Sequence, residues 1–394
     1  MKSRFLLPFM IITVLSQICI NNAFSVPAYP YPFEFKQPNG SVLTIQLKGD
    51  EKIHWAETKD GYTLLNNGKD GWEYAKLDSN GDLVCSGILA REPQDRSAID
   101  NTLLLQTPVK LRFSKRQVNT LLSIWNARSS IVPDIFNPNG NKNLVMILIG
   151  YTDLAFTKTQ ADFNGLMNQI GYNLNGAVGS VKDYFLENSY NQFNVTTTVA
   201  GPYTAAHNMA YYGANDAYGN DINPQALITE AVYLADPDVN YADFDNDGDG
   251  GVDGVYVIYA GYGEAGGGGA NTIWPHASNI PTVTLDGKTI SKYSCSNELS
   301  GNSGSDMTTI GVICHEFGHV CGSPDYYDTD YDTDGQYDGT GTWDLMAGGS
   351  WNGSPAGNRP PHMMPIDKIK NTWITFFYLT SIRDENKTMF SFSR

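Results

Sequence analysis

The chain has 394 residues, with 26 basic and 42 acidic side chains and a formal net charge of −16 at pH 7. This acidity argues against nucleic acid and anionic membrane surfaces as partners, because both carry negative charge themselves. Aromatic residues make up 12% of the chain and charged residues only 17%, which excludes global disorder. The length is sufficient for one large and one small domain, each with its own core.

The N-terminus has the pattern of a secretory signal peptide. Lys2 and Arg4 precede an apolar run over residues 5–20, and Ala23 and Ser25 supply small residues where a signal peptidase acts. We predict cleavage after Ser25, which removes two positive charges and changes the net charge from −16 to −18. No later segment is long and apolar enough to span a membrane, so we expect a secreted protein without stable membrane association.

The next part of the chain predicts a small β-rich module. Short alternating strands at 42–47, 61–64 and 72–75 are separated by turns that contain Asn-Gly pairs. A charged, helix-prone stretch over 110–127 follows, and after it comes a segment rich in Pro, Asn and Ser, where proteolytic processing is easily accommodated.

From residue 143 the pattern changes to strands that alternate with helices. The apolar runs at 144–149 and 254–260 are typical of strands covered on both faces. Further expected elements are helices at 158–169, 180–188, 224–234 and 308–320, a strand at 193–199 and a hairpin around 285–287. The predicted fold class is α+β, with a mixed sheet and helices packed on it. The predicted organisation is a signal peptide at 1–25, a β-rich module at 26–107, a linker and processing region at 108–142, and a catalytic domain at 143–394.

A His-Glu-x-x-His motif on the last predicted helix indicates a zinc site. His315 and His319 are four residues apart, so one helix face presents both imidazoles to a single ion. Glu316 adjoins that face, where it can act as the general base. Gly322 can take a positive φ and end the helix, after which the chain turns back to offer Asp325 as third ligand. Three protein ligands leave the fourth position open, as a catalytic zinc requires.

A second element follows about twenty residues later. The Gly-rich segment 343–351 has Met346 at its centre, and in metzincin-like enzymes a methionine turn forms the floor beneath the metal. Ordinary core packing is the alternative interpretation of Met346. The two motifs in this order favour a zinc enzyme.

With these two motifs, the chain resembles the immune inhibitor A-type family of bacterial metallopeptidases. The resemblance covers about residues 143–373 and is carried by the zinc and methionine motifs and by segments 179–190, 252–264 and 273–276. Segments 49–51, 54–55 and 58–62 resemble the propeptides of such enzymes. The family implies a metzincin-like fold, zinc, calcium and secreted endopeptidase activity, with His315, His319 and Asp325 as ligands and Glu316 as base. The chain ends at Arg394 without the further domains that many members carry and that often help to choose substrates, so either the natural substrate stays open or the chain is a truncated product.

Two Asp-rich loops are candidate calcium sites. Carboxylates spaced by two, with glycines at the bends, suit Ca²⁺. The first loop offers Asp245, Asp247, Asp249 and Asp253. The second repeats the frame with Asp330, Asp332, Asp334 and Asp338. Solvated acidic turns are the alternative in both cases.

Outside the signal the chain has four cysteines. Cys314 and Cys321 lie roughly 10 Å apart along one helix, too far to bridge each other. A disulfide would join Cys295 to one of them, and buried free thiols are the equal alternative. His276 is the remaining histidine considered for a place in the cleft, against an ordinary core position.

These observations predict a secreted zinc endopeptidase that is made as a proenzyme and stabilised by calcium, with protein or peptide substrates. A non-catalytic calcium-stabilised surface or adhesion module with structural zinc is one alternative. A zinc hydrolase acting on non-peptide amides is another. The sequence makes no prediction about oligomeric state.

Overall fold

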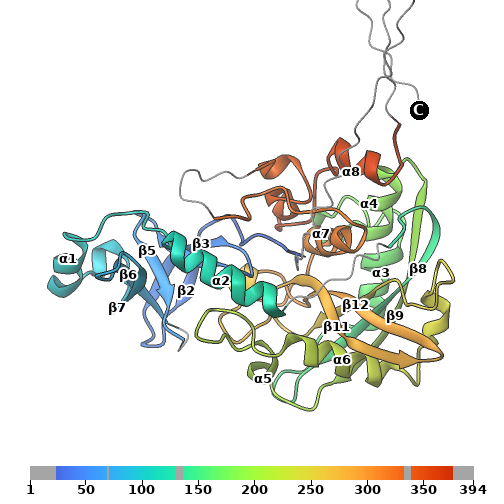
Figure 1. Ribbon diagram of the computed structural model, residues 1–394, viewed down its shortest axis with the longest axis horizontal. Coiled ribbons are helices and arrows are strands. Elements are labelled where there is room, and N and C mark those ends of the chain that lie inside the picture. Colours follow the sequence, from blue (N-terminus) through green and yellow to red (C-terminus); the bar gives the residue numbers. More distant parts are fainter. Residues whose placement is uncertain (1–23, 69–70, 129–135, 332–338, 376–394) are drawn as a thin grey trace, which may run out of the picture.

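The computed structural model describes residues 24–68, 71–128, 136–331 and 339–375. Figure 1 shows two separate β-sheets, a blue-to-teal one near the N-terminus and a larger one covered by helices. The expected α+β class is confirmed at this level. Residues 1–23 of the predicted signal peptide fall outside the described residues, whereas its last two residues, Phe24 and Ser25, form strand β1.

The first sheet forms the N-terminal module. It is antiparallel, with the strand order β2-β3-β4-β5-β6-β7. Alternate residues of β3, Leu43, Ile45 and Leu47, are buried and pack in one cluster with Trp72 and Tyr74. Its elements are β2 (Phe33–Lys36), β3 (Val42–Gly49), β4 (His54–Thr58), β5 (Thr63–Asn66), β6 (Trp72–Leu77), β7 (Leu83–Leu89), α1 (Ala98–Leu104) and α2 (Lys115–Arg128).

The second sheet is mixed, with the order β1-β11-β12-β10-β8-β9. Strands β12, β10, β8 and β9 are parallel, whereas β11 is antiparallel to both β12 and β1. The edge strand β1 comes from the very start of the described residues, so Phe24 and Ser25 lie in the same sheet as strands from residue 140 onward. The strands are β1 (Phe24–Ser25), β8 (Gly140–Gly150), β9 (Phe193–Thr204), β10 (Val255–Tyr259), β11 (His276–Leu285) and β12 (Lys288–Asn297).

Helices cover both faces of this sheet. Leu144, Met146 and Leu148 of β8 pack with residues of α3, α4 and α7, and the alternating Val145 and Ile147 pack with α6 on the other face. A continuous apolar run is therefore what a strand buried on both faces requires. The helices are α3 (Gln160–Asn168), α4 (Val181–Asn188), α5 (Met209–Gly213), α6 (Pro224–Ala235), α7 (Ile310–Val320) and α8 (Pro365–Lys370).

The predicted helices and strands of this region are present, with small shifts at their ends. Strand β8 begins at Gly140, and the preceding Phe136 is fully buried against Phe317 of α7. The four described cysteines, Cys85, Cys295, Cys314 and Cys321, are free thiols, so the disulfide alternative is not found. Within the described ranges, no helix combines the length and the apolar character needed to cross a membrane.

Candidate metal centre

Helix α7 carries the predicted metal ligands. Every residue from Ile310 to His319 is buried, which explains why this helix is apolar all round. Gly322 has a φ of 91°, and its N–H donates to the carbonyl of His319, so the helix ends where the sequence predicts. The chain then reverses and brings Asp325 beneath the helix.

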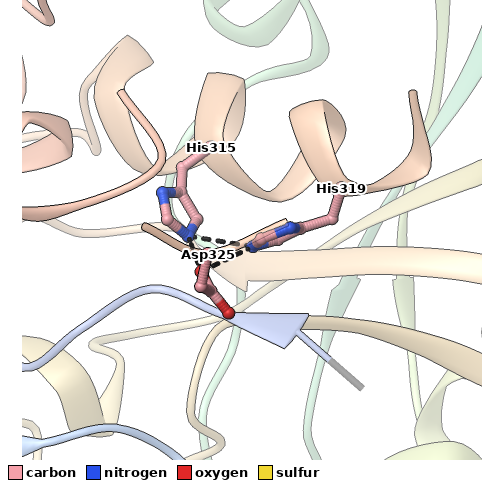
Figure 2. Close-up of side chains that lie close together, drawn as sticks. All are labelled: His315, His319 and Asp325. Carbon is pink, nitrogen blue, oxygen red and sulfur yellow. Dashed lines mark hydrogen bonds and ion pairs between the residues drawn. The ribbon is translucent and has the colours of Figure 1, made fainter. Parts of the chain in front are cut away.

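His315, His319 and Asp325 converge on one point (Figure 2). The Nε2 atoms of the two histidines are 3.0 Å apart. Asp325 Oδ1 lies 3.4 Å from Nε2 of His315 and 3.2 Å from Nε2 of His319. Zinc bonds of about 2.1 Å to nitrogen and oxygen separate tetrahedral ligands by about 3.4 Å, so the three atoms have the spacing of a zinc ligand set.

Hydrogen bonds on the far side of each ring determine which nitrogen faces the centre. Nδ1 of His315 lies 2.8 Å from the carbonyl oxygen of Leu345, and Nδ1 of His319 lies 2.8 Å from that of Ser323. Each Nδ1 must carry hydrogen to make this contact, so each Nε2 presents a lone pair when the ring is neutral. Two lone pairs and a carboxylate meeting inside the protein require a cation, and these residues therefore fit a metal ion.

The charges of the three groups agree with this requirement. Burial would raise the pKa of Asp325, but the two imidazoles hold it well below its usual value. Burial by itself would lower the pKa of His315, yet the hydrogen bond to Asp325 and the charge of Glu316 raise it to about 9. Burial lowers the pKa of His319. The ionised carboxylate of Asp325 thus favours a positive charge between the two imidazole rings. A divalent metal ion provides twice the charge of a single proton at this position.

Met346 lies under the helix. Its side chain is fully buried, and a Cβ placed on Gly318 would come within 2.8 Å of the Met346 sulfur. Glycine at this position of the motif therefore allows the methionine to approach the helix closely. The adjacent Leu345 supplies the carbonyl that orients His315. The segment therefore contacts helix α7 both at Gly318 and at the ring of His315.

The start of the chain crosses this centre, which the sequence did not indicate. The backbone N–H of Val26 donates to Oε1 of Glu316 at 2.8 Å, whereas Oε2 has no hydrogen-bond partner among the described residues. Burial raises the pKa of Glu316 to about 8. The blue strand below the three side chains in Figure 2 is β1, which pairs antiparallel with β11 through Ser25 and His276. The segment therefore lies over the centre as an extended peptide.

Tyr327 is a second group that the sequence did not indicate. Its hydroxyl donates to the carbonyl oxygen of Ser25 at 2.6 Å. This carbonyl belongs to the same peptide bond whose N–H reaches Glu316. The module also contributes Asp50, whose buried carboxylate contacts the hydroxyls of Tyr327 and Tyr331. Tyr327 stands two residues after Asp325, but only the fold brings it to this peptide bond.

The first Asp-rich loop forms a separate cluster. Carboxylate oxygens of Asp245, Asp247 and Asp253 lie within 4.8 Å of one another. Asp249 is not part of this group, and its carboxylate accepts the N–H of Gly251 at 2.7 Å instead. The Lys288 ammonium lies 2.6 Å from Asp245 and lowers the pKa of that carboxyl. Of the four positions predicted in the second loop, Asp330 lies among the described residues. The predicted positions Asp332, Asp334 and Asp338 fall outside the described residues.

The family model of the immune inhibitor A peptidase M6 catalytic domain matches residues 151–374, more than half of the chain, including the zinc and methionine motifs. The chain belongs to the immune inhibitor A peptidase M6 family. The family is one of metallopeptidases, which agrees with a cation between His315, His319 and Asp325. The N-terminal module lies outside the matched range.

Individual relatives agree with this assignment. The chain is 34% identical over 212 residues to the pre-pro-metalloprotease PrtV of Vibrio cholerae serotype O1, covering 46% of this chain and 22% of that protein. It is 31% identical over 220 residues to Immune inhibitor A of Bacillus thuringiensis subsp. alesti, covering 48% of this chain and 31% of that protein. The match therefore spans less than a third of either relative.

Among solved structures, metalloproteinase-II from Bacteroides fragilis is similar at 13% sequence identity. The alignment covers 88% of this chain and 91% of that chain, with a TM-score of 0.27. A superposition of this quality does not define the position of any residue.

Proposed function

We propose that this member of the M6 family is a secreted zinc endopeptidase that is made as a latent proenzyme. One observation carries the proposal. The Ser25–Val26 peptide bond lies in an extended strand over the three candidate ligands, with its N–H on Glu316 and its carbonyl on Tyr327. A cleft that holds an extended peptide in this way suits a protein substrate more than a small amide.

His315, His319 and Asp325 would hold the zinc ion. When bound, the ion supplies Lewis-acid polarisation of a carbonyl group and makes a coordinated water more acidic. Glu316 would take the proton of the attacking water and carry it to the leaving amine, since one of its oxygens has no other partner in the described part of the chain. Tyr327 would donate a hydrogen bond to the scissile carbonyl oxygen as negative charge develops there.

The residues around the N-terminal segment support latency. Trp274 donates its indole N–H to the carbonyl of Val26, and Trp351 donates to that of Pro27, both at 2.9 Å. Ser25 and Val26 are completely buried. Without β1, strand β11 would be the edge of the sheet, and a substrate would bind along it. In the full chain, β1 covers this edge. Removal of the predicted signal peptide after Ser25 would also remove β1 and the carbonyl that Tyr327 holds. The amino group of Val26 would then be the group that contacts Glu316, and latency would rest on this contact, on the bonds of Val26 and Pro27 to Trp274 and Trp351, and on the module.

Casein hydrolysis by the full chain and by a form processed to remove the N-terminal module tests this function. We expect activity in the processed form alone, because the module covers the base and the strand edge. Treatment with 1,10-phenanthroline should abolish the activity, and added Zn²⁺ should restore it. A correctly processed, zinc-loaded protein without activity would favour the alternative in which the zinc is structural. If the full chain is as active as the processed form, the proposed latency is wrong, but the proposed peptidase activity is not contradicted.

The calcium proposal makes a separate prediction for the Asp245, Asp247 and Asp253 cluster. Calcium at about a hundred times its Kd would add about 2.7 kcal/mol to the free energy of unfolding. EGTA should then lower the Tm by roughly 5–10 °C before zinc is lost. Asp247→Asn should abolish the difference between the calcium and EGTA melting curves. Asp249→Asn is the matched control, because Asp249 lies in the same loop but outside the cluster. Identical melting curves with and without EGTA would exclude the site.

A further inference from the structure

A second buried cluster joins the N-terminal module to the catalytic region. Glu51 lies in the turn between β3 and β4 of the module, Asp221 precedes α6, and His276 is the first residue of β11. The three residues are 3%, 7% and 1% exposed. A ligand atom from each lies within 4.8 Å of the other two. Neither the proposed catalysis nor the candidate zinc site uses these side chains.

The two acids in this cluster have unsatisfied oxygens. Oε2 of Glu51 and Oδ1 of Asp221 have no hydrogen-bond partner among the described residues. The other Asp221 oxygen accepts the N–H of Trp274 at 3.0 Å, and Oε1 of Glu51 lies 3.4 Å from Nδ1 of His276. In the described part of the chain, neither acid forms an ion pair with a lysine or arginine; Lys52 instead lies 3.9 Å from Asp50.

Such an arrangement is costly without a positive charge, because a buried carboxylate needs a partner. Burial raises the pKa of Glu51 well above its usual value, and the charges of Asp221, Glu316 and Asp50 raise it further, whereas the charge of Lys52 lowers it by a smaller amount. Burial likewise raises the pKa of Asp221. Two acids that oppose each other's ionisation would weaken the contact between the module and the catalytic region unless something neutralises both.

His276 can supply the third ligand. Its Nε2 lies 2.6 Å from the hydroxyl of Tyr293, and its Nδ1 lies 2.7 Å from the carbonyl oxygen of Trp274. Without a cation, Nδ1 carries the hydrogen and donates it to the Trp274 carbonyl, as the Nδ1 atoms do in the first site. A cation bound between Nδ1, Glu51 and Asp221 would replace that hydrogen, and the ring would then carry its hydrogen on Nε2 and donate it to Tyr293. The separation of 3.4 Å between Nδ1 and the Glu51 oxygen equals that between His315 Nε2 and Asp325 Oδ1 in the first site.

We propose that Glu51, Asp221 and His276 form a second divalent-cation site that fastens the N-terminal module to the catalytic region. One imidazole nitrogen and two carboxylates are a ligand set that suits Zn²⁺ better than Ca²⁺, which prefers oxygen alone. Removal of the module withdraws Glu51, so the processed protein keeps two of the three ligands and releases the ion. This inference does not depend on peptidase activity.

Zinc content of the full chain tests the site. In a His315→Ala/His319→Ala background, which removes the first site, about one equivalent of zinc should stay bound after gel filtration. Adding Glu51→Gln or Asp221→Asn should remove it, and both replacements keep the size of the side chain and its ability to accept a hydrogen bond. Glu34→Gln, at an exposed position of the same module, is the matched control and should keep the zinc.

Two further measurements keep the test decisive if the double variant does not fold. The otherwise unchanged full chain should hold about two equivalents of zinc, and Glu51→Gln should hold about one. Replacement of zinc by Co²⁺ should give two sets of visible d–d bands, of which Glu51→Gln loses one. A full chain with one equivalent, or a Glu51→Gln protein with as much zinc as the unchanged chain, would overturn the proposal.

Discussion

Replacing Glu316 by glutamine should lower kcat of the processed protein by about 10²- to 10⁴-fold while the bound zinc is unchanged. Glutamine has the size of glutamate but cannot take a proton from water at neutral pH. Glu316 is fully buried and is no member of the three-residue ligand group, so the substitution removes the base and leaves His315, His319 and Asp325 in place. The measurement is casein or peptide hydrolysis beside zinc analysis of the same samples.

The control for this variant is Glu187→Gln, an exposed position on α4 that should keep full activity. The full-length Glu316→Gln protein adds a second check. Because the glutamine oxygen still accepts the N–H of Val26, the module should remain docked and protect the bond between Phe24 and the buried Ser25 from added chymotrypsin as before. Full activity in the Glu316→Gln protein would show that another group is the base.

The grouping of His315, His319 and Asp325 could be anticipated from the sequence because it depends on local structure. His315 and His319 follow from helical spacing alone, and Gly322 and Asp325 follow from the rule that a glycine ends a helix and reverses the chain. The apolar runs that became β8 and β10 were long enough to identify buried strands. These features depend on residues close together in the chain, where periodicity is informative.

Contacts between distant segments were not predictable in the same way. Val26 and Glu316 are 290 residues apart, and Tyr327 and Ser25 are 302 apart. No periodic pattern links such positions, and the sequence around Val26 predicts only the end of a signal peptide. The cluster of Glu51, Asp221 and His276 could not be predicted for the same reason, since its members come from three separate segments of the chain. Asp249 differs for a local reason, because its carboxylate accepts a backbone N–H within the loop rather than joining the Asp245 cluster.

These distant contacts also give the module a physical role beyond covering the cleft. In the proposed latent form, the segment at Ser25 and Val26 lies where a substrate would bind, and Asp50 and Glu51 bring two acids next to it, close to Glu316. The contact between the module and the rest of the chain is therefore stabilised by strand pairing. It is destabilised by the buried carboxylates unless their charge is neutralised. Such a contact can hold the module firmly before processing and release it once the chain is cut.

Tyr327→Phe should lower kcat of the processed protein by about 10²- to 10³-fold with little change in KM. The hydroxyl now holds the Ser25 carbonyl at 2.6 Å, and a substrate carbonyl in that position would gain most from the same hydrogen bond when its oxygen becomes negatively charged. A bond that strengthens in the transition state affects kcat more than substrate binding. Steady-state kinetics on one peptide substrate gives both constants.

Tyr331→Phe is the matched control for Tyr327→Phe. Tyr331 lies four residues further along the same loop and contacts Asp50 of the module rather than the peptide bond. Once the module is removed, that hydroxyl has lost its partner, so the processed Tyr331→Phe protein should keep its kcat. If Tyr327→Phe also keeps its kcat, the hydroxyl serves only to hold the N-terminal segment, and the full-length variant should then become active without processing. A loss of kcat in Tyr327→Phe alone would instead identify the same hydrogen bond as serving both the latent and the active protein.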